Sequence, residues 1–188
     1  MASRAARRLL WASALGVFGW FAAVYCITAT FHLAYSNYEV VASALTSGDF
    51  SAWPAWLVYL AWAFVAGLAL IAASLALAAQ AFKKAGLGVL HALCLWGASL
   101  GLALFLVGVY ALAAGRSIGL SLVALGLLSL LAATAAAGFG LIKLGASANS
   151  ALMRAAGVLL IVGIFLEVLA PAAWFLAFAG AARLRERI

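Results

Sequence analysis

Long apolar stretches, separated by short polar or basic clusters, occupy nearly the whole chain. Five of them cover approximately residues 9–31, 54–79, 87–114, 117–142 and 152–182. Each exceeds the roughly 20 residues that a helix needs to cross a hydrocarbon core. The pattern therefore predicts an all-α, polytopic membrane protein with about five transmembrane helices, forming a single domain over residues 1–188.

The longest connection, residues 32–53, lies between the first two apolar stretches. It contains Glu39 and Asp49 but neither Lys nor Arg, which is typical of a loop on the outer side of a membrane. Ser36 and Glu39 have the spacing of a capping box, in which two side chains satisfy the first N–H groups of a helix. We therefore expect a short amphipathic helix on the outer surface.

Composition excludes most other classes of protein. Hydrophobic residues make up 70% of the chain and charged residues 8%, whereas soluble domains carry about 25% charged residues. The net charge of +7 is not a nucleic-acid signal, because the basic residues stand at the ends of the apolar stretches. The lipid bilayer is the expected partner, and nucleic acid is not.

The basic residues also predict an orientation. Arg4, Arg7 and Arg8 precede the first apolar stretch, which favours a cytoplasmic N-terminus in a multi-pass protein of the cell membrane. This start resembles a signal peptide, but its apolar part is too long for one, so we expect it to be retained as the first helix.

The fifth apolar stretch, bounded by Arg154 and Arg183, allows two topologies. As one helix, it leaves seven basic residues inside and four outside; if Pro171 turned the chain back, the division would be ten against one. The stretch is too short for two full crossings of about 20 residues each. The expectation is therefore one long helix, kinked at Pro171.

Small residues recur at helical intervals and predict close helix packing. One set lies in the first helix (Ala12, Gly16, Gly19, Ala23, Cys26, Thr30), one in the third (Gly97, Gly101, Gly108, Gly115) and one in the fourth (Gly119, Gly126, Ala133, Gly140). Five helices are not expected to turn every such stripe inward. Some stripes are therefore expected to face membrane protein partners or further copies of the chain.

Glu167 is the one acidic residue inside an apolar stretch. At that depth a carboxylate is costly, so it indicates either an ion or proton site, or a protonated group that holds neighbouring helices in register. Ser99, Ser129 and Thr134 are expected at a similar depth and are its candidate partners. We expect the Glu167 side chain to face the bundle interior or a protein partner, because hydrocarbon offers no hydrogen bond.

No other chemistry is predicted. His32 and His91 belong to opposite ends of the expected bundle, so they are not expected to ligate one haem or metal. Cys26 and Cys94 lie within apolar stretches and are expected to be small core residues. The sequence indicates no catalytic residues, no cofactor site and no metal site.

One segment consists of GVLLIVGIFL, then Pro171, then WFLAFAG before a basic end. It resembles small polytopic integral membrane proteins of unknown function, of the kind found in archaea. The resemblance covers about 30 residues. It implies neither an activity nor any site residue.

Two functions are consistent with these patterns. The first is a non-catalytic accessory or scaffold subunit of a larger membrane complex, favoured by the small extramembrane mass and the small-residue stripes. The alternative is a small proton- or cation-conducting transporter or channel that uses Glu167. An enzyme is not expected.

Overall fold

The computed structural model describes residues 2–47 and 54–186, and all of its regular structure is α-helical. The helices are α1 (Ala2–Ser36), α2 (Tyr38–Ser47), α3 (Ala55–Lys84), α4 (Gly88–Ala113), α5 (Ile118–Ser147), α6 (Ala151–Val162) and α7 (Leu169–Glu186). Four of them, α1, α3, α4 and α5, are long and apolar enough to cross a membrane, and α6 is a shorter apolar helix. The predicted fold class is confirmed.

The first four predicted helices correspond to the four long ones, with shifted ends. Helix α1 continues five residues beyond the predicted end at 31, and α3 reaches Lys84 instead of 79. Most of the predicted outer loop is therefore helical, and α2 lies where the short helix was expected. Asp49 lies outside the described residues.

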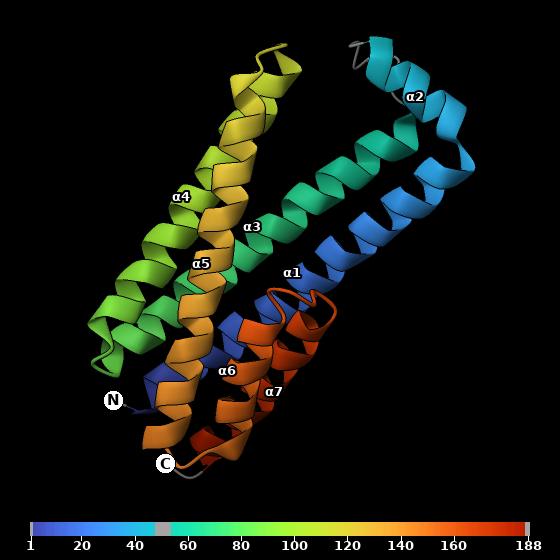
Figure 1. The fold of residues 1–188 in the computed structure, drawn as a ribbon. Coiled ribbons are helices and arrows are strands. Elements are labelled where there is room, and N and C mark those ends of the chain that lie inside the picture. Colours follow the sequence, from blue (N-terminus) through green and yellow to red (C-terminus); the bar gives the residue numbers. More distant parts are fainter. Residues whose placement is uncertain (1, 48–53, 187–188) are drawn as a thin grey trace.

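The long helices are arranged as two antiparallel pairs. Helix α1 packs along α3, and α4 packs along α5, while α3 also contacts α4. In Figure 1 the pairs lie close together near the labelled chain ends and diverge toward the end that carries α2. Helices α6 and α7 pack on α5 and α1 respectively and occupy the closed half of this fork.

The predicted small-residue stripes lie at these helix contacts. A Cβ atom on Gly108 of α4 would lie 2.6 Å from the backbone nitrogen of Val123 on α5, and one on Gly126 of α5 would lie 2.6 Å from that of Phe105 on α4. On α1, Gly19 faces Gly67 and Ile71 of α3 in the same way. Backbones approach this closely only where a side chain is missing or small. Stripe residues of α1, α4 and α5 are therefore used for contacts within the chain, whereas nothing lies within 4 Å of a Cβ on Gly115; contact of the stripes with partners stays a prediction.

The expectation of one helix over 152–182 is wrong. This segment forms α6 and α7, joined by a turn over residues 163–168. The two helices run antiparallel and pack against each other (Figure 1). The segment is too short for two full crossings, but a hairpin that enters half of the bundle and returns needs only about half that length. Helix α6, with 12 residues, is about 18 Å long.

Local chemistry explains why the chain turns here. Gly163 follows the last residue of α6. A Cβ on it would lie 3.1 Å from the backbone nitrogen of Ala170, so a side chain there would crowd the start of α7. Pro171 lies in the first turn of α7, where its missing N–H costs no helical hydrogen bond. Farther down, Gly180 of α7 faces Met153 and Leu152 of α6.

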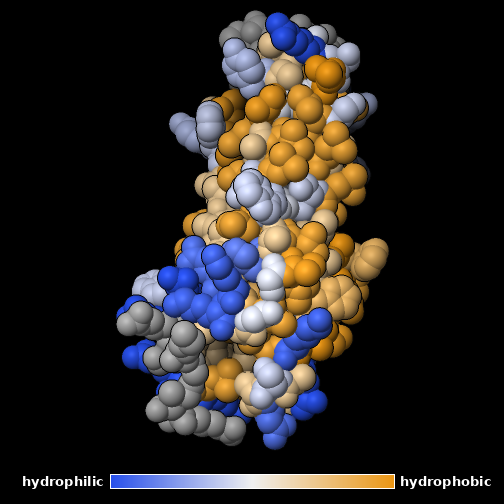
Figure 2. Space-filling model, turned by 90° about the vertical axis from the view of Figure 1, so that its left-hand side faces the viewer, coloured by the Kyte–Doolittle hydropathy of each residue, from blue (hydrophilic) through white to orange (hydrophobic). Residues whose placement is uncertain are grey.

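The hairpin places almost all the basic residues at one end of the bundle. Figure 1 shows the N-terminus, the α3–α4 turn, the α5–α6 turn and the C-terminus at this end. Of the ten Lys and Arg residues that the structure describes, nine belong to these segments, and Arg116, between α4 and α5, is at the other end. We call the end with the N-terminus and the α3–α4 and α5–α6 turns the basic end. Figure 2 shows hydrophilic residues gathered toward it and a broad apolar surface above.

Candidate functional site: a cavity beside Glu167

Glu167 lies in the turn at the tip of the α6–α7 hairpin, about midway along the long helices (Figure 1). The neighbouring tip residues Phe165, Leu166 and Val168 are apolar and exposed, Phe165 at 83%. The N–H groups of residues 163–166 all bond to carbonyl oxygens three or four positions back. Apart from Glu167, the tip thus presents apolar side chains, and the backbone donors of residues 163–166 are satisfied within it.

Glu167 borders a cavity of about 130 Å³ at the fork between the helix pairs. The walls come from the middle of three long helices: Trp20, Ala23 and Ile27 of α1, Phe64, Leu68 and Ile71 of α3, and Leu127, Leu130, Leu131 and Thr134 of α5. A cavity of roughly 150 Å³ accepts benzene, so this one has room for a small ion with several waters. The Glu167 side chain is exposed on the isolated chain; it borders the cavity and is not enclosed within the bundle.

Two further polar groups belong to this cavity. The Thr134 hydroxyl, on a residue 2% exposed, donates to the carbonyl oxygen of Leu130 over 2.9 Å. Its oxygen lone pairs remain able to accept from a ligand. The indole N–H of Trp20 is buried and has no acceptor among the described residues.

The structure brings together two of the four predicted polar residues. Thr134 lines the same cavity as Glu167. Ser129, in contrast, donates to the carbonyl oxygen of Gly97 over 3.1 Å and so joins α5 to α4. Ser99 is exposed on α4 and is not among the residues that line the cavity. Trp20 was not among the predicted residues.

A closed layer lies between this cavity and the basic end. On α3, Leu75, Ala78 and Ala79 are fully buried, and on α5 so are Ala137 and Leu141. These residues follow the cavity-lining Ile71 and Thr134 along their helices. The core between the Glu167 cavity and the basic end is thus filled by buried side chains, among them that of Ser74.

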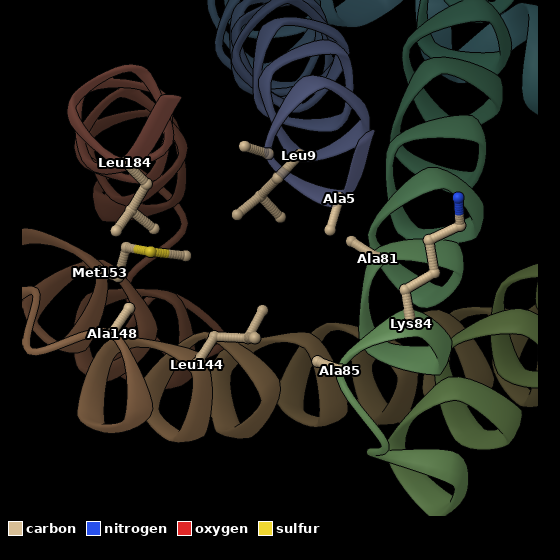
Figure 3. A pocket seen from close by; sticks show the side chains of 10 residues that line it. Ala5, Leu9, Ala81, Lys84, Ala85, Leu144, Ala148, Met153 and Leu184 are labelled. Atoms are coloured by element: carbon tan, nitrogen blue, oxygen red, sulfur yellow. The ribbon is translucent and has the colours of Figure 1, made fainter. Parts of the chain in front are cut away.

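A second, larger cavity of about 310 Å³ lies beyond that layer, at the basic end. It is lined by Ala5, Ala6 and Leu9 of α1, Ala81 and Lys84 of α3, Ala85, Leu144 of α5, Ala148, Met153 of α6 and Leu184 of α7. Figure 3 shows the Leu9, Leu144, Met153 and Leu184 side chains converging on the space, with Lys84 at one edge.

The histidines and cysteines take structural places. His91 Nδ1 lies 2.9 Å from the carbonyl oxygen of Ala79, which joins α4 to α3. His32 lies near the C-terminal end of α1, away from the basic end. Cys94 donates weakly to the carbonyl oxygen of Ala133 over 3.5 Å, and Cys26 is buried. Within residues 2–47 and 54–186, no three His, Cys, Asp or Glu residues gather in a way that could hold a metal ion.

No family model matches this chain, and neither a curated protein nor a solved structure is similar to it. The resemblance drawn from the fifth apolar stretch is thus supported only at the level of a helical protein with four long apolar helices.

Proposed function

We propose that this protein is a small membrane transporter for protons or monovalent cations, with Glu167 as the group that binds the ion. The observation that carries the proposal is the Glu167 carboxylate at the rim of a cavity midway through the bundle. An ionisable side chain at that depth is costly unless it serves an ion, a proton or a partner. No basic side chain lines the cavity, so the ion itself would neutralise the carboxylate.

The ligand set favours a proton or a monovalent cation over a divalent metal. Glu167 and Thr134 are the side chains with oxygen atoms among the residues that line the cavity. Ca²⁺ takes six to eight oxygen ligands, and Mg²⁺ requires a near-ideal octahedral arrangement. A partly hydrated monovalent cation needs fewer protein ligands, and a proton needs the carboxylate alone.

The closed layer favours a carrier over an open pore. Leu75, Ala79 and Leu141 are fully buried in the core between the cavity and the basic end. An ion bound at Glu167 would reach that end only after the packing around these residues changes. Transport should therefore be slow and should saturate with ion concentration.

The test is flux into vesicles that contain the purified protein. Vesicles with the native chain should take up protons or monovalent cations down an imposed gradient, and Glu167→Gln should abolish the uptake. Glu39→Gln is the matched control, because Glu39 is exposed on α2 and far from the cavity. Native flux that survives Glu167→Gln, or an absence of flux in the native protein, would contradict the proposal.

We also infer that the basic end faces the cytoplasm of a cell membrane. Among the described residues, the division of nine basic residues against one follows from the hairpin, and an excess of Lys and Arg is characteristic of cytoplasmic segments. A fluorescent protein fused to the C-terminus should then fluoresce when it folds inside the cell. A reporter active only on the outer side of the membrane would contradict this orientation.

An accessory role in a larger membrane complex stays a prediction. The small mass outside the apolar helices supports this role. The glycine stripes support it less, because many of their residues make contacts within the chain. Extraction in mild detergent followed by native mass measurement tests it. Other proteins that remain bound in fixed ratio would favour this role, and a monomer that transports ions alone would exclude it.

A further inference from the structure

The cavity at the basic end has mostly apolar walls. Five of its ten lining residues are alanine, so the space exists because side chains are short there. Leu9, Ala81 and Met153 of its walls are each no more than 2% exposed, which places the cavity between the helices and not on their outer surface. Its volume of about 310 Å³ is twice that of a cavity that accepts benzene.

The surroundings of this cavity attract an anion. Arg7 and Arg8 lie beside the lining residues of α1, Lys83 and Lys84 end α3, and Arg183 and Arg185 flank Leu184 on α7. Among the described residues, Glu186, the last residue of α7, is the one acidic residue in the segments at this end. An aqueous anion would gain from the charges but not from the apolar walls, and a neutral lipid would gain from the walls alone.

We propose that this cavity is a binding site for an anionic phospholipid, with one acyl chain between the helices and the phosphate among the basic residues. The cavity is formed where α1 and α6 begin and where α3, α5 and α7 end, the depth at which lipid headgroups meet their chains. Basic pockets between transmembrane helices recognise anionic headgroups in this way. Lys84 is the basic residue among those that line the cavity and lies at its edge (Figure 3), and we expect it to contact the phosphate.

The experiment compares lipids that differ in headgroup charge. The purified full chain in detergent is titrated with phosphatidylglycerol or phosphatidylcholine of identical chains, and the bound lipid is counted by native mass spectrometry. We expect one tightly retained phosphatidylglycerol, bound at least about ten-fold more tightly than phosphatidylcholine, with the preference declining as salt is added. Equal retention of the two lipids would overturn the proposal.

Matched variants separate the cavity from the surface charge. Ala148→Phe fills the cavity and should remove the tight site, whereas Ala146→Phe, exposed two residues earlier and not in the lining, should keep it. Lys84→Gln should weaken phosphatidylglycerol about five-fold, and Lys83→Gln, next to it but outside the lining, should have a smaller effect. Helicity and thermal stability confirm that each variant folds.

A preference for phosphatidylglycerol that survives Ala148→Phe would place the lipid on the basic surface and overturn the cavity site. If Ala148→Phe does not fold, the comparison of Lys84→Gln with Lys83→Gln decides the test. An equal loss of phosphatidylglycerol affinity in these two variants would overturn the cavity site. Because the readout is lipid retention, its outcome is independent of ion flux through the Glu167 cavity.

Discussion

The fully buried indole ring of Trp174 on α7 lies against Gly16 on α1, in space that a side chain at position 16 would occupy. A Cβ at Gly16 would be 2.5 Å from the Trp174 ring, well inside van der Waals contact. This contact seats the returning arm of the hairpin on the first helix. Because Glu167 lies in the turn that precedes α7, the contact between Gly16 and Trp174 helps to set its position.

Gly16→Leu should therefore detach the hairpin from α1. Overpacking of this kind costs about 1–3 kcal/mol or more, measured as the shift in unfolding by sodium dodecyl sulfate. Trp174→Ala opens the space again, so the double variant should lose less stability than the sum of the two single variants. Additive losses would show that the two residues do not share this space.

Gly108→Val should destabilise the α4–α5 pair. Its side chain would collide with the backbone of Val123 and with the carbonyl oxygen of Gly119, which side-chain rotation cannot relieve. We expect a loss of about 2 kcal/mol or more, read from the same unfolding curve. Gly88→Val is the control, since nothing lies within 4 Å of a Cβ there; equal losses at both positions would contradict the packing.

Ser74→Ala should loosen the contact between α3 and α1. The buried Ser74 hydroxyl donates to the carbonyl oxygen of Ala12 over 2.7 Å, and such bonds between membrane helices contribute about 0.6 kcal/mol on average, up to about 1.7. We expect a loss in the upper part of this range. Ser13→Ala should cost less, because the Ser13 hydroxyl bonds to Leu9 within its own helix.

The four long helices and their contacts could be predicted from local signals. Lys83, Lys84 and Arg116 mark the turns, and apolar length alone identifies a helix that spans a membrane. The glycine stripes predicted close helix packing without saying which helices meet, and the structure places Gly108 of α4 against Gly119 of α5. These features lie within single helices or between sequence neighbours.

The hairpin was set aside because the stretch is too short for two full crossings, although the charge count favoured a turn. An apolar stretch looks the same whether it crosses once or enters halfway and returns. The contacts that decide between the two join residues far apart in sequence, such as Gly16 with Trp174. Of the site, Glu167 and Thr134 were identifiable as polar residues at matching depth. Trp20 was missed because an indole within an apolar helix resembles any core aromatic residue until its N–H lacks a partner.

Ser99 illustrates a signal that was present but not used. It follows Gly97 by two positions, which is about 200° around a helix. Gly97 and Gly101 mark the face of α4 that packs on α5. A residue two positions from Gly97 therefore points to the opposite side, where Ser99 is found exposed.

The hairpin is the central claim, and one disulfide tests it directly. A Cβ at Gly180 would lie 3.5 Å from the Cβ of Leu152, within the range that a disulfide spans. With Cys26 and Cys94 replaced by alanine, Leu152→Cys and Gly180→Cys should form an intramolecular bond on mild oxidation, identified by mass spectrometry of the linked peptides from monomeric protein. In one straight helix these positions would be about 42 Å apart, and the absence of the bond in a folded, membrane-inserted variant would contradict the hairpin.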